Sequence, residues 1–317
     1  MKFNQIYFDA VWADLNEATT YPSRRPTLAH YTSIATLERI VRSGELWLAH
    51  PMLMNDHQEM RWGMVEGQKR LLASEEIASA CASADKHQLL LAAFNKHYDQ
   101  FATADAFDVY VGCFCEHDPS DHDGLLSMWR GYGANGGGAA IVFDTSKLIH
   151  DDESPLVLAP VVYGTDQQRL NWIETKISEL ARLIKTHNPP KLELDRAAWH
   201  FFNRLKYFAL FSKHCGFREE REWRVVYMQD RDPKREYHSR FTYLTNEAGI
   251  EPRMKLQVGS DLKGAEPITL SSLVTRILLG PRAGALLSLM ATRRMMEQLG
   301  EPQLAARVLS SSTPFRG

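Results

Sequence analysis

The stretch Phe107-Asp108-Val109-Tyr110-Val111-Gly112-Cys113-Phe114-Cys115 has the pattern of a strand buried in a sheet. Its side chains alternate between two faces, so Val109, Val111, Cys113 and Cys115 share one of them. The segments on either side of this strand decide which kind of sheet it belongs to.

Helical blocks, rather than single crossover helices, interrupt the expected strands. Residues 57–105 are rich in Ala, Leu, Glu, Gln and Lys and predict two or three helices, and residues 166–213 predict a second block broken at Asn188-Pro189-Pro190. Strands are expected at 28–32, 45–49, 107–115, 139–143, 161–163, 220–228 and 275–279, and further helices at 34–42, 125–129 and 283–299.

This order lacks regular βαβ alternation, which favours an α+β fold over a doubly wound sheet. We expect one α+β domain over residues 28–300, with the two helical blocks as insertions. Residues 1–27 are expected to form an N-terminal arm, and residues 301–317 a C-terminal tail.

The composition is that of an ordinary globular protein. The chain has 317 residues, of which 44% are hydrophobic and 24% charged, and a net charge of −2. Such a balance does not favour nucleic acid as a partner, although a local basic patch is not excluded. Four cysteines, no apolar leader and no uncharged apolar run of ~20 residues predict a cytoplasmic protein that does not enter a membrane.

The densest polar cluster lies around residue 222. On a strand, Glu220, Glu222 and Arg224 would point to one face, and Lys213 precedes them. A carboxylate at the end of a core strand is costly to bury unless it is paired or functional. The alternative is a Glu–Arg ladder on a solvated face.

Two further groups of residues are candidates for binding. His30 stands beside Tyr31 and Thr32 in a short expected strand, although a lone histidine is more often a packing residue. Trp129 and Tyr132 are three positions apart on an expected helix, where they could either pack together or offer a flat surface to a planar ring.

Two short motifs have simpler explanations beside functional ones. Asn55 and Asp56 precede Glu59 with the spacing of a helix start, or they form a polar rim of the site. The run Gly131-Tyr132-Gly133-Ala134-Asn135-Gly136 matches a dinucleotide-binding motif, but it has a helix before it and a strand after it, which is the wrong order. It is a flexible turn, or it lets a ligand approach the backbone.

No metal site is expected. The group Cys113, Cys115, His117 and His122 lacks the spacing of a zinc site, and both thiols fit a buried strand face better. A metal-dependent nuclease site is a weaker alternative that fits no metal motif; it would use Asp56, Glu59, Glu220 and Glu222.

The candidates belong to a longer series of motifs. In chain order these are His30-Tyr31-Thr32, Gly44 to Trp47, Asn55-Asp56 with Glu59, Cys113 to Glu116, Leu126 to Trp129 with Tyr132, Gly138 to Phe143, Val162-Tyr163, Lys213, Glu220-Arg221-Glu222-Trp223-Arg224 and Gly280-Pro281-Arg282. The series resembles a widespread bacterial domain family of unknown function over residues 28–282. His57 stands where that family usually has proline, and Cys115 where it often has serine.

That family is in turn similar to the ADP-ribosyltransferase fold of toxins and defence proteins, which share a His, aromatic, Glu triad. The resemblance implies a mixed or antiparallel β core with helical insertions, and NAD as substrate. It also implies that His30 contacts a ribose of NAD and that Trp129 or Tyr132 stacks on nicotinamide. Glu222, or alternatively Glu220, would be the catalytic carboxylate.

The chemistry explains why these residue types would be needed. Cleavage of the nicotinamide–ribose bond develops an oxocarbenium cation, which a fixed carboxylate stabilises as it forms. A second carboxylate could deprotonate the acceptor. Arg224 and Lys213 could keep the carboxylates ionised or contact pyrophosphate. Tyr31 and Thr32 complete the expected cofactor-binding set.

The sequence therefore predicts a bacterial NAD-dependent ADP-ribosyltransferase or NAD glycohydrolase of a toxin or phage-defence type. The alternative is a non-catalytic module on the same fold that binds a nucleotide or a partner. The sequence does not specify the acceptor, which could be a protein, a nucleic acid or a small molecule.

Overall fold

The computed structural model describes residues 2–15, 17–53, 57–151, 153–246 and 249–314. The chain forms two compact units, and each unit is assembled from separate segments. The first consists of Met1–Glu17, His50–Val109 and Val161–Phe217, and the second of Ala18–Ala49, Tyr110–Pro160 and Arg218–Gly317. Both predicted helical insertions lie in the first unit, together with most of the predicted N-terminal arm.

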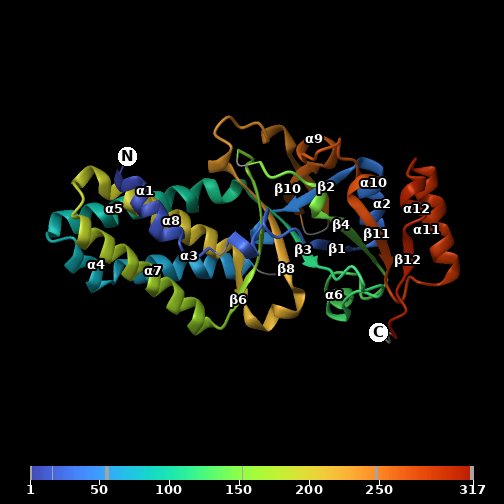
Figure 1. Ribbon diagram of the computed structural model, residues 1–317, viewed down its shortest axis with the longest axis horizontal. Coiled ribbons are helices and arrows are strands. Elements are labelled where there is room, and N and C mark those ends of the chain that lie inside the picture. Colours follow the sequence, from blue (N-terminus) through green and yellow to red (C-terminus); the bar gives the residue numbers. More distant parts are fainter. Residues whose placement is uncertain (1, 16, 54–56, 152, 247–248, 315–317) are drawn as a thin grey trace. The chain divides into compact units, whose positions relative to one another are not determined.

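The first unit is a helical bundle with one short pair of strands. Helix α8 is buried along most of its length, and α1, α3 and α5 pack against it (Figure 1). Its elements are α1 (Lys2–Trp12), η2 (Pro51–Leu53), α3 (His57–Leu72), α4 (Glu75–Ala80), α5 (Ala84–Thr103), η3 (Asp105–Asp108), β6 (Val162–Gly164), α7 (Asp166–His187), α8 (Lys191–Phe211) and β7 (Ser212–His214).

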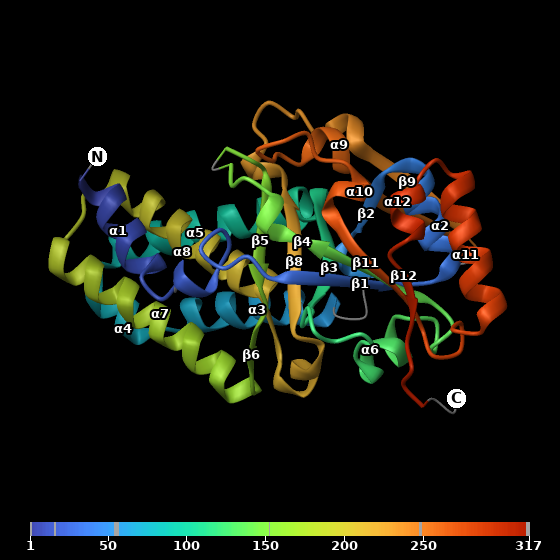
Figure 2. The ribbon, with the colours of Figure 1, turned by 45° about the vertical axis from the view of Figure 1, so that its right-hand side comes forward.

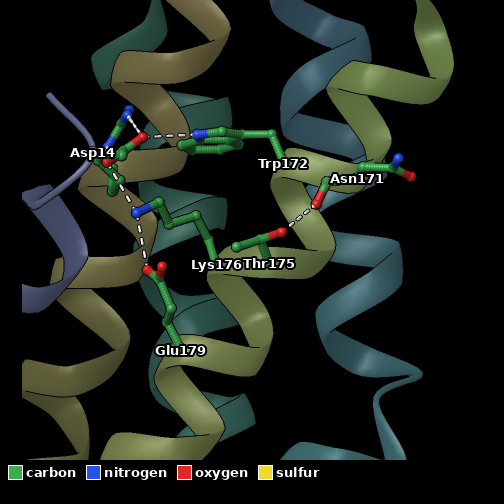
Figure 3. A network of polar contacts seen from close by, with 7 residues as sticks. Asp14, Asn171, Trp172, Thr175, Lys176 and Glu179 are labelled. Atoms are coloured by element: carbon green, nitrogen blue, oxygen red, sulfur yellow. Dashed lines mark hydrogen bonds and ion pairs between the residues drawn. The ribbon is translucent and has the colours of Figure 1, made fainter. Parts of the chain in front are cut away.

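Close packing and one cluster of charged residues, whose two cations are buried, hold this bundle together. A Cβ atom at Gly67 of α3 would lie 2.3 Å from the Leu205 side chain of α8, so the two helices can approach only because residue 67 is glycine. Asp14, just after α1, accepts a hydrogen bond from Trp172 and forms ion pairs with Lys176 and Arg204 (Figure 3). These contacts fix the end of α1 to α7 and α8.

The break predicted between the two long helices is confirmed. Helix α7 ends at His187, and Asn188 follows in the left-handed conformation, with φ of 40°. Its backbone N–H still bonds to the carbonyl of Ile184, and α8 begins at Lys191. A left-handed asparagine followed by two prolines is a typical helix end.

The second unit is built on a mixed, largely antiparallel sheet. The strand order is β12-β11-β4-β1-β3-β2-β10-β9, with β8 paired to β3 and β5 (Figure 2). Strands β11 and β12 run parallel to each other within this sheet. The strands are β1 (Thr27–Thr32), β2 (Glu45–Ala49), β3 (Val109–Glu116), β4 (Ala139–Asp144), β5 (Leu156–Pro160), β8 (Glu222–Met228), β9 (Phe241–Asn246), β10 (Gly249–Gln257), β11 (Val274–Leu279) and β12 (Val308–Ser310).

Helices and short turns connect these strands. Ser33 caps α2 by accepting from the Thr36 N–H, and Gly44 ends it with φ of 67°, as the sequence predicts. The elements are η1 (Glu17–Thr19), α2 (Ile34–Ser43), α6 (Leu126–Gly131), η4 (Thr145–Lys147), η5 (Cys215–Glu220), η6 (Gln229–Arg231), η7 (His238–Arg240), α9 (Val258–Asp261), α10 (Leu270–Leu273), α11 (Leu286–Gln298) and α12 (Pro302–Ala305).

Two apolar clusters mark the two faces of this sheet. Successive residues of a strand alternate between the clusters, as in β4, where Ile141 belongs to the larger cluster and Val142 to the smaller one. The larger cluster also holds Leu28, Phe114 and Trp223. This alternation assigns each strand side chain of the candidate site to a face.

The α+β class is therefore confirmed, as are most of the expected strands. The β9–β10 hairpin, β5 and β12 were not expected. The strand expected at 161–163 is present as β6, which pairs in parallel with β7 within the first unit.

Candidate functional site

The two carboxylates around which the site was predicted are not on one strand. Glu220 ends the short helix η5, Arg221 follows with φ of 43°, and β8 begins only at Glu222. The Arg221 N–H bonds back to the carbonyl of Arg218, which closes a tight turn. The expectation that Glu220 shares a strand face with Glu222 is wrong, because the left-handed residue between them ends the extended conformation.

Glu222 and Arg224 do share a face of β8, as predicted. Arg224 Nε lies 2.7 Å from Glu222 Oε1, and Nη2 lies 3.2 Å from Oε2. Each of the two residues is only 5% exposed. A guanidinium that holds both carboxylate oxygens fixes the carboxylate in one orientation, and the buried charge is compensated.

Glu220 has a different set of surroundings. Its side chain is half-buried, and the hydroxyl of Tyr132 donates a hydrogen bond of 3.1 Å to Oε1. Tyr132 directly follows α6 and is 38% exposed, so part of its ring faces solvent. This contact joins two segments that were predicted separately as site residues.

Trp129 is placed too deeply to offer its ring to a ligand. The side chain is fully buried, its Nε1–H donates to the Asp123 carbonyl at 2.8 Å, and the ring meets Tyr31 edge-on at 4.8 Å. A Cβ atom on Gly133 would lie 2.5 Å from the Trp129 ring. Of the two predicted aromatic residues, Trp129 is therefore part of the core, whereas Tyr132 is at the surface.

The glycine-rich run forms a turn packed around this tryptophan. It lies between α6 and β4, so the predicted order of helix before and strand after is confirmed. The Gly136 N–H donates to the Trp129 carbonyl, and the Gly138 N–H to the Gly133 carbonyl. A Cβ atom on Gly138 would lie 2.1 Å from the Thr32 carbonyl, so this glycine lets the turn lie against β1.

His30 lies where β1 and β3 separate. The register of these strands ends at Ala29 opposite Cys115, and continuing it would pair Tyr31 with Cys113. Instead, His30 Nδ1 lies 3.1 Å from the Cys113 carbonyl oxygen. Burial lowers the pKa of His30, although the bond to the Cys113 carbonyl partly offsets this effect. A neutral ring that donates from Nδ1 fits this geometry.

Strand alternation separates His30 from Glu222. Position 30 of β1 shares the face of Leu28, which belongs to the larger cluster, whereas Tyr31 belongs to the smaller one. On β8, Trp223 belongs to the larger cluster, so Glu222 points to the opposite face. The structure therefore brings Glu222 to Arg224 and Glu220 to Tyr132, but it places His30 and Glu222 on opposite faces of the sheet.

The neighbours of His30 have structural contacts of their own. The Tyr31 hydroxyl accepts a hydrogen bond from the Leu125 N–H at 2.9 Å, and burial raises its pKa well above the ordinary range. Thr32 is buried at the end of β1, opposite Ala139. These positions make both residues part of the packing between β1 and the elements beside it.

The remaining predicted residues are Lys213, Asn55 and Asp56. Lys213 belongs to the first unit, where it is fully buried in β7 and its ammonium lies 4.5 Å from the centre of the Phe217 ring. Asn55 and Asp56, the predicted rim of the site, lie outside the described residues.

Three residues near the site were not predicted to take part in it. Arg221 approaches the thiol of Cys115, whose pKa burial raises to about 12 despite this cation. Glu116 accepts a hydrogen bond from Trp223 Nε1 at 3.1 Å and pairs with Arg24, which lies over the Trp223 ring. Nothing in the local sequence pattern shows these contacts, because the partners are distant along the chain.

No group of three or more His, Cys, Asp or Glu side chains in the described part of the chain is arranged to hold a metal ion. Within the same residues, no helix is long and apolar enough to cross a membrane.

A comparison with family models supports part of the resemblance found in the sequence. No curated protein and no solved structure matches the chain. The model of a family described as a protein of unknown function, DUF2971, matches residues 128–225. This segment is shorter than the 28–282 expected, but it includes Trp129, Tyr132, Glu220, Glu222 and Arg224.

Proposed function

We propose that this protein is an NAD-dependent ADP-ribosyltransferase or NAD glycohydrolase, built on an ADP-ribosyltransferase-like fold and acting in the cytoplasm as a toxin or phage-defence protein. The observation that carries the proposal is the contrast between Glu222 and Glu220. They are two residues apart in the chain. Glu222 is buried and held by Arg224, whereas Glu220 is half-buried and lies beside Tyr132. Carboxylates in contrasting environments commonly take different catalytic roles.

In this proposal Glu222 stabilises the transition state. Its two oxygens are already oriented by Arg224, so little reorganisation is needed when positive charge develops on the ribose. Arg224 also compensates the charge of the carboxylate in its buried position. A carboxylate fixed in this way interacts more strongly with the oxocarbenium ion than with neutral ribose.

Glu220 is assigned to the acceptor. As the bond between nicotinamide and C1′ breaks, its electron pair leaves with nicotinamide, which becomes neutral. The oxygen of water, or a nucleophilic atom of an acceptor, then bonds to C1′ and gives its proton to Glu220. A half-buried carboxylate can exchange that proton with solvent, which a fully enclosed one cannot do readily.

Tyr132 is the aromatic residue best placed for the nicotinamide ring. It is partly exposed and lies beside Glu220, whereas Trp129 is enclosed. A planar ring stacked on a tyrosine gains roughly 0.5–1.5 kcal/mol beyond its buried area. Trp129 then acts by supporting the segment that positions Tyr132.

The proposal rests on the carboxylates and Tyr132 rather than on a complete triad. The predicted ribose contact of His30, and the nucleotide contacts of Tyr31, Thr32 and Lys213, stay predictions. Incubation of the purified protein with NAD, with and without cell lysate as a source of acceptors, tests the activity. Release of free nicotinamide supports the proposal, and its absence under both conditions contradicts it.

A second candidate is a non-catalytic module that binds NAD or a related nucleotide, or a partner. The enclosed Glu222–Arg224 pair favours it, because a carboxylate held on both oxygens is also what a purely structural ion pair looks like. Calorimetry separates the two candidates. Binding of NAD that generates no nicotinamide, and that changes less than about threefold in Glu222→Gln, supports the module.

A further inference from the structure

The strand β9 (Phe241–Asn246) forms one end of the large sheet of the second unit. It pairs with β10 on one side, where Tyr243 lies opposite Pro252 and Thr245 opposite Ile250. An edge strand of this kind presents backbone N–H and C=O groups to its open side, and natural proteins usually block such edges.

The direction of these backbone groups follows from the neighbouring strands. The Val258 N–H, just after β10, donates to the Gly44 carbonyl at 3.0 Å, so even-numbered residues of β10 point their backbone groups toward β2. Odd-numbered residues of β10 therefore bond to β9. In the register, these odd-numbered residues lie opposite even-numbered residues of β9. The backbone groups of the odd-numbered residues Tyr243 and Thr245 therefore point to the open side of β9.

The sequence of β9 itself lacks the usual protection of an edge strand. The strand Phe241-Thr242-Tyr243-Leu244-Thr245-Asn246 contains no charged residue and no proline, and its Phe, Tyr and two Thr residues favour strands. By contrast, the part of β10 that extends past the end of β2 carries two protective features of an edge strand. These are Pro252 and the Glu251–Arg253 ion pair. The hairpin is thus protected on its β10 side and unprotected on its β9 side.

Large apolar side chains are exposed at the same place. Tyr243 is 68% exposed and Ile250 70% exposed. The opposite end of the sheet, β12, has only three residues and packs against α11. The combination of open backbone groups and exposed apolar side chains is therefore found at β9, not at β12.

We propose that β9 pairs antiparallel with β9 of a second copy of this chain, which makes one continuous sheet across a two-fold axis. With Tyr243 opposite its own copy, the two residues exchange both backbone hydrogen bonds, and each Thr245 N–H reaches the Phe241 carbonyl of the other chain. The Tyr243 rings then form a cross-strand aromatic pair. Because β9 contains no charged residue, pairing it with its own copy brings no like charges together.

Paired substitutions at Tyr243 and Ile250 test this arrangement, since both side chains are equally exposed but only Tyr243 would face its copy. The full-length protein is expected to sediment as a dimer. Tyr243→Lys places two ammonium groups opposite each other and should weaken the dimer about tenfold or more, whereas Ile250→Lys should change it less than about threefold.

Cysteine crosslinking tests the register itself. Residues in an antiparallel hydrogen-bonded pair have Cα atoms about 5.5 Å apart, which is within the range of a disulfide. Tyr243→Cys should therefore give a covalent dimer on mild oxidation, above the background of the wild-type cysteines. Ile250→Cys should not give a covalent dimer, because three strand-to-strand spacings would separate residue 250 of one chain from residue 250 of the other.

Three results would overturn the proposal. They are a wild-type protein that stays monomeric at high micromolar concentration, a dimer insensitive to Tyr243→Lys, and crosslinking of Ile250→Cys that equals or exceeds that of Tyr243→Cys. Circular dichroism of each variant, with an unchanged unfolding midpoint, establishes that the hairpin is intact.

Discussion

The hydroxyl of Tyr132 donates a hydrogen bond of 3.1 Å to Oε1 of Glu220. Tyr132 directly follows α6 and Glu220 ends η5, so the two residues come from segments that are far apart in the chain and from different sequence motifs. The bond places a partly exposed aromatic ring beside a half-buried carboxylate, two residues before the fixed carboxylate of Glu222. The proposed chemistry depends on this grouping.

Tyr132→Phe is expected to separate the hydrogen bond from the ring. The phenylalanine keeps the stacking surface but leaves Glu220 less well positioned, so kcat for NAD cleavage should fall about tenfold while KM changes little. Tyr132→Ala removes the ring as well and should also raise KM. Steady-state kinetics of nicotinamide release distinguish the two effects. Equal kinetics for Tyr132→Ala and wild type would remove Tyr132 from the site.

Gly138→Ala should destabilise the second unit strongly. The added methyl group would lie 2.1 Å from the backbone carbonyl of Thr32, so the turn must move away from β1. Overpacking of this kind typically costs about 1–3 kcal/mol. Gly131→Ala is the matched control, because a Cβ atom there meets nothing within 4 Å. Urea unfolding should show a lower midpoint for Gly138→Ala and less than about 0.5 kcal/mol change for Gly131→Ala.

Asp14 should make the first unit sensitive to acid. Burial alone would raise its pKa, but Arg204, Lys176 and Trp172 outweigh burial and lower the pKa from 3.8 to about 2. Because the folded value lies below the unfolded one, the stabilisation is complete above about pH 4 and is lost as the pH falls toward 2.

Asp14→Asn should therefore lower the free energy of unfolding at pH 7. It should also make that free energy depend less strongly on pH in the acid range. It leaves Lys176 and Arg204, which are nearly fully buried, without their shared carboxylate. We expect a loss of about 2 kcal/mol, less than for a fully buried pair. Asp85→Asn removes an exposed ion pair with Lys191 and should change stability by less than about 0.5 kcal/mol. Equal effects of the two variants in urea titrations would contradict this prediction.

His30 should contribute to a loss of stability in mild acid. Burial lowers its pKa from 6.5, so the unfolded chain binds a proton in a range where the folded chain does not. Stability therefore rises with pH through about 6.5 and falls below it. The same direction holds for His50, His117 and His200.

His30→Gln removes one of these groups while its amide can still donate to the Cys113 carbonyl. The difference in unfolding free energy between pH 8 and pH 5.5 should become smaller than in wild type. Guanidinium titrations at the two pH values measure it. An unchanged difference would mean that His30 is protonated equally in both states.

The sequence patterns that proved reliable were those governed by local physics. The period of two in Val109–Glu116, the Ser33 and Gly44 caps of α2 and the break at Asn188 all depend on residues close together in the chain. The face shared by Glu222 and Arg224 was predictable for the same reason. The order of helix and strand around the glycine run was also sufficient to reject a dinucleotide-binding turn.

The errors arose where distant residues or a single backbone angle decide the outcome. Arg221 in the left-handed conformation removes Glu220 from the strand, and no pattern predicts an arginine there. Likewise, the separation of His30 from Glu222 depends on which face of the sheet each strand presents. That is set by pairing with β3 and β4, not by the motifs themselves.

The most direct test of the central claim compares nicotinamide release by wild type, Glu222→Gln and Glu219→Gln under identical conditions. Glu219 is the exposed neighbour of the site and serves as the control. We predict that wild type and Glu219→Gln release nicotinamide at similar rates, and that Glu222→Gln is slower by about 10²–10³. A wild type that releases no nicotinamide, or a Glu222→Gln variant as active as wild type, would contradict the account.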